Sequence, residues 1–166
     1  KLHFEDFASL LEDQKKSIAD SLKAEIDMLI DEVRQISANL NPPVLNEFTL
    51  DIALRNLCQG MSHITEIPVR YEASGNFSLL PDKHKIYIYR IVQEGLNNAI
   101  KHADANEIII QVLISKSSVL LMIEDDGKGF KSSRIQRDGN GLYNMRERTN
   151  LLGGKFALNT SPGDGC

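Results

Sequence analysis

The chain has little of what marks several classes of protein. Its 166 residues include only two cysteines, Cys58 and Cys166, and no tryptophan. Two cysteines rule out a disulfide framework and are typical of a reducing compartment. A formal net charge of −4 and a pI near 5.6 argue against direct nucleic-acid binding, which requires a basic surface. No apolar run approaches the roughly 20 residues of a membrane span, and the first residues do not resemble a signal peptide.

Several common signatures of nucleotide and metal sites are absent as well. Gly154-Lys155 has no glycine five places earlier and no following serine or threonine, so it is not a P-loop. No His-Arg-Asp catalytic loop of a protein kinase occurs. No group of cysteines and histidines has the spacing of a zinc site. A nucleotide site, if one exists, must use another pattern.

Two regions with different patterns follow one another. Up to about Leu40 apolar residues recur at helical spacing, and Asn41-Pro42-Pro43 ends this region because proline lacks an N–H and restricts its predecessor. A helix with one apolar stripe can dimerise or pack on its own domain, and composition does not decide between these. From Glu47 onward, helical and β-rich runs alternate, which indicates an α/β sandwich with helices on one face of a mixed sheet. The expected elements are a helix at Leu50–Met61, a helix starting at Pro81, a helix at Tyr143–Leu152, and strands at Val69–Glu72, Glu107–Ile114, Val119–Ile123 and Lys155–Thr160.

The stretch from Glu94 to His102 gathers unusual side chains on one face of a helix. At about 100° per residue, Glu94, Asn98 and Lys101 fall within a narrow arc, with His102 just beside it. The opposite arc is apolar and can face a core. A carboxylate, a metal-compatible amide and two phosphate-compatible cations together suggest a magnesium-nucleotide site. On its own, however, such a face is more often simply solvated.

Two glycine-containing segments follow at greater distance along the chain. A hydrophobic strand runs into Asp125-Asp126-Gly127-Lys128-Gly129, where glycines allow positive φ and close approach to a flat ring. A carboxylate at the strand end can accept a hydrogen bond from an exocyclic amine. Next, Gly139-Asn140-Gly141-Leu142 opens a helical pattern, and a helix N-terminus offers free N–H groups to phosphate. Taken singly, each segment is equally compatible with an ordinary turn.

Together and in this order, the three segments resemble the N, G1 and G2 boxes of the GHKL (Bergerat-fold) ATPases, which include sensor histidine kinases, ninety-kilodalton heat-shock chaperones, gyrase B and mismatch-repair ATPases. Residues 89–103, Tyr-Arg-Ile-Val-Gln-Glu-Gly-Leu-Asn-Asn-Ala-Ile-Lys-His-Ala, are similar to the N box of one subfamily of histidine kinases. Members of that subfamily signal to response regulators with helix-turn-helix outputs. Residues 141–148 and Leu152-Gly153-Gly154 are similar to its G2 region.

The resemblance implies an architecture. Residues 1–45 would be part of the helical hairpin that dimerises and carries the phosphoacceptor. Residues 46–166 would be the ATP-binding catalytic domain, a two-layer α+β sandwich without its last strand. Family members carry the acceptor histidine within Glu-Leu-His-Asp; His3 lacks that context, so the acceptor is expected before Lys1. Cys166 stands where the family usually has threonine, which bears on adenine affinity.

The resemblance also implies roles for individual residues. Glu94 would be the catalytic base or orienting carboxylate, and Asn98 would coordinate Mg²⁺ on the ATP phosphates. Asp125 would accept a hydrogen bond from the adenine amino group, and residues 131–138 would form a mobile lid. The remaining ATP-binding positions would be Lys101 and His102 for phosphate oxygens, Gly127 and Gly129 for approach to the base, and Gly139, Gly141 and Leu142 for the β- and γ-phosphates.

The sequence therefore supports the hypothesis of a sensor histidine kinase catalytic region that uses ATP and Mg²⁺. It would phosphorylate a histidine outside this segment, for relay to a response-regulator aspartate, and would not autophosphorylate alone. We expect a cytoplasmic homodimer joined through the N-terminal helices, attached to a membrane only through segments outside this sequence. Two alternatives are an anti-sigma-type serine kinase, which would lack the long N-terminal helix, and a degenerate signalling module that uses nucleotide only as a conformational ligand.

Overall fold

The computed structural model describes residues 22, 26, 42–130 and 140–166. The chain divides into two compact units, Lys1–Pro42 and Pro43–Cys166. The predicted helical segment of residues 1–45 falls almost entirely outside the described residues, as do Gly139 and the predicted lid at 131–138. Within the described ranges, no helix is long and apolar enough to cross a membrane.

The second unit consists of helices and strands that alternate along the chain. The helices are α2 (Val44–Glu47), α3 (Leu50–Thr65), the 3-10 turn η1 (Phe77–Leu79), α4 (Asp82–Asn98), the π-helical turn η2 (Ala99–Ala103) and α5 (Asn140–Leu151). The strands are β1 (Val69–Ser74), β2 (Ile108–Ile114) and β3 (Val119–Asp125).

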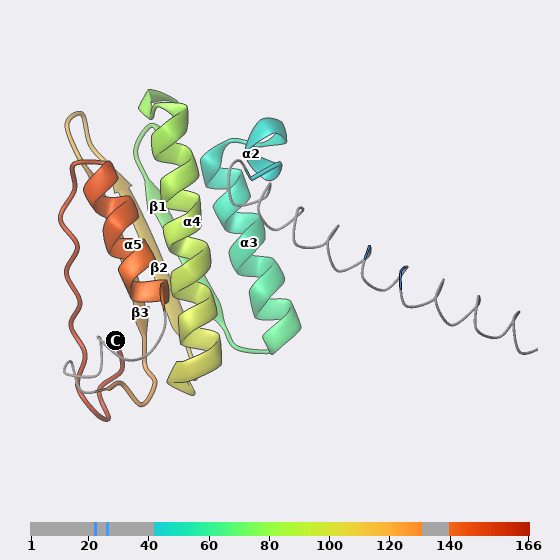
Figure 1. Cartoon of the computed structure of the whole chain (residues 1–166), viewed down its shortest axis with the longest axis vertical. Coiled ribbons are helices and arrows are strands. Elements are labelled where there is room, and N and C mark those ends of the chain that lie inside the picture. Colours follow the sequence, from blue (N-terminus) through green and yellow to red (C-terminus); the bar gives the residue numbers. More distant parts are fainter. Residues whose placement is uncertain (1–21, 23–25, 27–41, 131–139) are drawn as a thin grey trace, which may run out of the picture. The chain divides into compact units, whose positions relative to one another are not determined.

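The three strands form one mixed sheet in the order β1-β2-β3. β1 and β2 are parallel, and α4 makes the crossover between them. β2 and β3 form the predicted antiparallel hairpin, closed by a hydrogen bond from the Ser115 amide to the Ser118 carbonyl at 2.9 Å. In Figure 1, α3, α4 and α5 all lie on the same face of the sheet. The predicted α/β fold with helices on one face is therefore confirmed.

The core lies between β2 and the two helices α3 and α4. β2 alternates as a half-covered strand should: Ile108, Ile110 and Val112 are fully buried, whereas the residues between them are more exposed. From the helices, Leu54 of α3 and Val92 of α4 are also fully buried. Because β2 is the central strand, this core fixes α4 along the middle of the sheet.

α4 comes close to the sheet at Gly95. A Cβ there would lie 2.5 Å from Ile123 Cδ1, a distance at which something must shift. The absence of a side chain therefore lets α4 lie close to β3. Glu94 and Asn98 of α4 and Asp125 at the C-terminal end of β3 line the same cavity.

The end of the chain and the start of α4 differ from the sequence-based expectation. Residues 155–160 were expected to form a strand, yet they pair with no described strand. One contact of this segment is with α5: the Arg146 guanidinium lies 5.6 Å from the centre of the Phe156 ring. Pro81 is the residue that caps α4 rather than its first helical residue, and its carbonyl accepts hydrogen bonds from the amides of His84 and Lys85.

Candidate nucleotide-binding site

The end of α4 presents the four polar residues singled out in the sequence. Glu94 and Asn98 lie one turn apart and both line a large cavity. The helix then widens into η2, so the expected regular α-helix through His102 is wrong for its last turn. Lys101 and His102 project from this π-helical turn, are exposed, and still line the same cavity. Single π-turns inside helices are frequent at functional sites.

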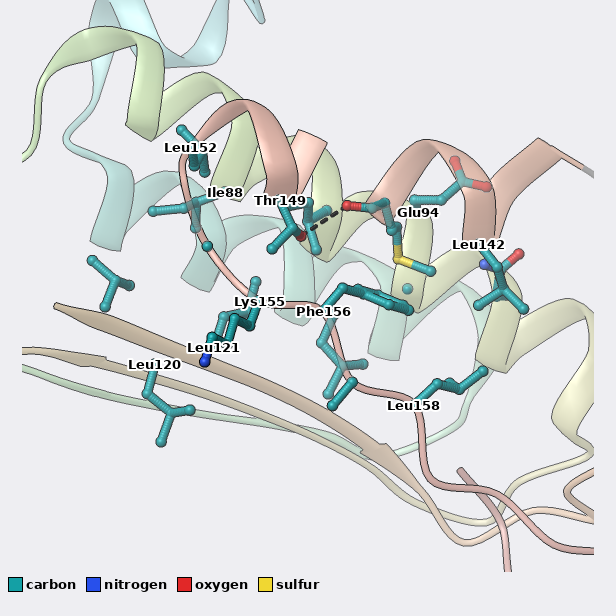
Figure 2. A pocket seen from close by; sticks show the side chains of 18 of the residues that line it. Ile88, Glu94, Leu120, Leu121, Leu142, Thr149, Leu152, Lys155, Phe156 and Leu158 are labelled. Carbon is teal, nitrogen blue, oxygen red and sulfur yellow. Dashed lines mark hydrogen bonds between the residues drawn. The ribbon is translucent and has the colours of Figure 1, made fainter. Parts of the chain in front are cut away.

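The start of α5 lies against the end of α4. A Cβ at Gly141 would overlap Glu94 Oε1, and it would lie 3.2 and 3.3 Å from Asn98 Nδ2 and Oδ1. Figure 2 shows Glu94 beside the first turn of α5, next to Leu142. The first turn of α5, which carries the free N–H groups and the positive dipole end of the helix, therefore lies beside the side chains of Glu94 and Asn98. This arrangement offers an anion site next to a carboxylate and an amide.

Asp125 is the last residue of β3 and lines the cavity. Its Oδ1 accepts a hydrogen bond from the Gly127 amide at 3.0 Å. In the part of the chain that the structure describes, Oδ2 has no hydrogen-bond partner and remains open to a ligand donor. Burial raises the pKa of this carboxyl, with a further contribution from the charge of Asp126, while the Gly127 amide opposes the shift.

Asp126, unlike Asp125, binds backbone amides of another loop. Its Oδ1 accepts hydrogen bonds from the Asn106 amide at 2.7 Å and the Glu107 amide at 2.9 Å. These bonds, with the Glu107 amide first, lower the pKa of Asp126. Asp126 therefore joins the loop after η2 to the end of β3, and it does not line the cavity, whereas Asp125 does.

The two glycines after Asp125 are required by the packing of the chain itself. A Cβ at Gly127 would overlap the Ala103 carbonyl at the end of η2, where the Lys128 amide donates a hydrogen bond of 2.7 Å. Gly129 has a φ of +54°, and a Cβ there would overlap the Ser161 carbonyl. Gly129 lines the cavity, whereas Gly127 is not among the lining residues.

The chain returns to this site at its C-terminal end. Cys166 lines the cavity, and its backbone pairs with that of Asp125 in both directions. Burial raises the pKa of the Cys166 thiol, and the charge of Asp125 adds to the effect, while the Thr160 side chain opposes it. Thr160, which sequence reasoning did not single out, binds this end of the chain through its hydroxyl. No local sequence signal marks its bond to the Phe130 amide, because these two residues are 30 positions apart.

The cavity measures about 1370 Å³, within which a nucleotide can be accommodated. Its polar end is formed by α4, η2 and the start of α5. Its apolar part lies between α5 and β3, and Figure 2 shows Phe156 and Leu158 there, with Leu121 on the strand beneath. The predicted residues that line this one cavity are Glu94, Asn98, Lys101, His102, Asp125, Gly129, Gly141 and Leu142.

A family model, described as histidine kinase-, DNA gyrase B- and HSP90-like ATPase, matches residues 83–166, just over half of the chain. The chain belongs to this ATPase family. The match begins in α4 and includes every predicted site residue. The resemblance recognised in the three segments is thus confirmed, and membership of an ATPase family implies ATP binding.

Curated relatives narrow the comparison to histidine kinases. The chain is 30% identical over 155 residues to the signal transduction histidine-protein kinase/phosphatase DegS of Brevibacillus brevis, a match that covers 93% of this chain and 40% of DegS. It is 33% identical over 135 residues to the sensor histidine kinase MctS of Rhizobium johnstonii, covering 80% of this chain and 29% of MctS. The chain therefore spans less than half the length of these relatives.

A solved structure agrees with this grouping. The histidine kinase domain of the blue-light activated histidine kinase EL346 from Erythrobacter litoralis superposes with a TM-score of 0.57 at 26% identity. That superposition covers 71% of this chain and 58% of the other.

Proposed function

We propose that this chain is the ATP-binding catalytic region of a two-component sensor histidine kinase. It binds ATP in the position from which the γ-phosphoryl group is transferred to a histidine located outside the described residues. From that histidine the group passes to an aspartate of a response regulator. The observation that carries the proposal is the meeting of Glu94 and Asn98 with Gly141 at one end of a cavity that also contains Asp125.

Each part of the site has a distinct task in this proposal. Asp125 accepts a hydrogen bond from the adenine amino group through Oδ2, while Gly127 holds Oδ1. Lys101 and His102, exposed at the cavity wall, attract the phosphates. The amides at the start of α5 bind the β- and γ-phosphates. Glu94 orients the incoming histidine or accepts its proton. The chemistry is mainly positioning and charge neutralisation.

The donors at the polar end fit Mg²⁺. The ion prefers oxygen ligands and is usually held by few protein groups together with phosphates and water. Asn98 offers an amide oxygen, and Glu94 lies one turn away on the same helix. When bound, Mg²⁺ neutralises the charge of the phosphates. Asn98 would hold the ion beside the phosphates, which the amides of α5 would bind from the other element.

Calorimetric titration with Mg-ATP tests nucleotide binding directly. Asp125→Asn should weaken ATP affinity roughly tenfold or more, because a hydrogen bond to a charged acceptor is lost. Glu124→Gln is the matched control: Glu124 is the adjacent carboxylate of β3, is exposed, and does not line the cavity. Asn98→Ala should reduce the dependence of binding on Mg²⁺. Failure of the wild-type chain to bind Mg-ATP at hundreds of micromolar would refute the proposal.

Phosphoryl transfer needs a second experiment. Mixing this chain with ATP and a longer version that carries the acceptor histidine and an inactivated Glu94 should place labelled phosphate on histidine. The chain alone should remain unlabelled. Binding of ATP without any transfer in the mixture would instead favour a nucleotide-responsive signalling module.

The partners and the setting follow from the same proposal. The intact protein would be a cytoplasmic homodimer joined through helices that precede Pro43, and its protein substrate would be a response regulator. Analytical ultracentrifugation of chains that begin at Lys1 and at Pro43 would test the dimer. Loss of dimerisation on removal of residues 1–42 is the expected result, and an unchanged monomer in both would contradict it.

A further inference from the structure

The glycine turn after β3 is bonded along its length to the C-terminal end of the chain. We call residues 125–130 the base turn and residues 160–166 the closing turn. The Asp125 amide donates to the Cys166 carbonyl at 2.9 Å, and the Cys166 amide donates to the Asp125 carbonyl at 3.2 Å. Near the middle, the Gly163 amide donates to the Lys128 carbonyl at 2.8 Å. These three bonds involve only backbone atoms.

The hydroxyl of Thr160 makes the fourth connection. It accepts a hydrogen bond from the Phe130 amide at 3.1 Å and donates one to the Gly165 carbonyl at 2.8 Å. Both bonds are partly buried. Among the described residues, no other side chain forms hydrogen bonds that join these two turns. The connection can therefore be removed by substitution, whereas the backbone bonds cannot.

The position of Thr160 links it to the part of the cavity where Asp125 lies. Gly165 immediately precedes Cys166, whose backbone exchanges two hydrogen bonds with that of Asp125. A Cβ at Gly165 would overlap the Asp125 carbonyl, so the two turns are already in close contact. Phe130, at the other end of the base turn, lines the cavity. A displacement of Gly165 would therefore move its neighbour Cys166 in the cavity wall, and a displacement of Phe130 would move the wall directly.

We propose that Thr160 is a positioning residue for base recognition: its hydroxyl holds the base turn against the closing turn, so that Asp125 is presented to the purine in a fixed orientation. The inference rests on the proposed function, because it requires the base to bind at Asp125. It predicts a selective defect. Loss of the hydroxyl should weaken contacts to the base and leave contacts to the phosphates at α4 and α5 intact.

The test compares Thr160→Val, which keeps the shape and removes the hydroxyl, with Thr160→Ser, which keeps the hydroxyl. Binding of Mg-ATP and of inorganic tripolyphosphate with Mg²⁺ is measured for both by calorimetry. Thr160→Val should bind ATP roughly tenfold more weakly, since an amide and a carbonyl lose their partner. Its affinity for tripolyphosphate should change less than twofold. Thr160→Ser should resemble the wild type for both ligands.

Thr65→Val is the matched control. The Thr65 hydroxyl also makes a partly buried hydrogen bond of 2.8 Å, to the Met61 carbonyl within α3, and Thr65 does not line the cavity. It contacts neither turn through that bond. Thr65→Val should therefore leave the ratio of ATP to tripolyphosphate affinity unchanged, and urea midpoints of all variants should show that they fold.

The outcomes separate the two levels of inference. If the wild-type chain binds no ATP, the proposed function fails and this inference fails with it. If the wild type binds ATP and Thr160→Val binds it equally well, the positioning role of Thr160 is wrong while the proposed function stands. If Thr160→Val loses ATP and tripolyphosphate affinity in equal proportion, the hydroxyl supports the fold as a whole and the positioning role is again wrong.

Discussion

Replacing Gly141 by alanine should impair phosphoryl transfer with little effect on stability. Alanine can adopt the backbone conformation at this position, because Gly141 is not among the glycines with positive φ. The constraint comes instead from its neighbour: a Cβ would overlap Glu94 Oε1 and would come within 3.3 Å of the Asn98 amide. The substitution therefore acts on the site through contact rather than through the backbone.

The expected change in the free energy of unfolding is small. Alanine is preferred over glycine in a helix interior by up to about 1 kcal/mol, and less in the first turn. The overlapping atom is the end of a flexible side chain that faces an open cavity, so Glu94 can rotate away at little cost. These two effects oppose each other, and the unfolding free energy measured with urea should stay within about 1 kcal/mol of the wild type.

The effect on phosphoryl transfer should be much larger. Moving the Glu94 carboxylate by about 1 Å is enough to cost roughly 100-fold in rate when geometry controls the reaction. Transfer to the acceptor histidine in a mixed assay should fall by about that factor. ATP affinity should fall less, because the contacts at Asp125 lie on a different element.

Gly60→Ala provides the control. Gly60 lies within α3, also without positive φ, and no atom lies within 4 Å of the Cβ it would gain. This variant should gain up to about 1 kcal/mol in stability and keep full transfer activity. Unimpaired transfer by Gly141→Ala would show that a side chain at this position does not displace Glu94. A loss of several kcal/mol in its stability would show that Glu94 cannot rotate away from the added methyl group.

Three further predictions concern charge, core and thiols. Because burial raises the pKa of Asp125, ATP affinity should begin to fall with decreasing pH earlier than an ordinary aspartate pKa of about 3.9 would allow. The raised pKa of Asp125 also makes the stability of the fold depend on pH. Its contribution is fully present below the pKa of Asp125 in the unfolded chain and is lost as the pH rises through the pKa in the folded chain. The difference between the urea midpoints of the wild type and Asp125→Asn should therefore change across that pH range. Leu54→Ala should cost about 2–5 kcal/mol in urea unfolding, since Leu54 is 0% exposed, whereas Leu120→Ala, at 51% exposed, should cost less than about 0.5 kcal/mol. Iodoacetamide should label Cys166 and spare Cys58, because Cys58 is buried and its burial raises the pKa of the thiol to about 12. Saturating ATP should slow the labelling of Cys166. Equal labelling of both thiols would contradict the burial of Cys58.

Local pattern was sufficient for much of the fold. The hairpin of β2 and β3 was predictable because two β-branched runs flank a polar four-residue turn, and the residues that pair are close in sequence. The helix α3 extends four residues beyond the predicted end at Met61, to Thr65, where the apolar pattern weakens. Glu66, with a left-handed backbone, ends it, and no glycine marks that position; the signal that the sequence does carry is Pro68, three residues beyond Thr65.

Elements that depend on distant partners were not predictable in the same way. Residues 155–160 have the composition of a strand, yet they do not pair with the outer edge of β3, and Phe156 lies against Arg146 of α5 instead. The π-helical turn η2 has an ordinary helical sequence. Its last carbonyl, at Ala103, accepts a hydrogen bond from the Lys128 amide, so the end of this turn is held by a residue far along the chain.

The site shows the same division. The motif and its resemblance selected Asp125 as the ligand acceptor, but they gave no role to Asp126, the neighbouring acid at the end of the same strand. The structure supplies that role: two amides of the loop after η2 bind Oδ1 of Asp126, while Asp125 accepts a bond from one amide and lines the cavity. Asp126 therefore joins two segments of the chain, and Asp125 faces the cavity. This division depends on the loop after η2 meeting the end of β3, a contact between residues about 20 apart that no local pattern specifies.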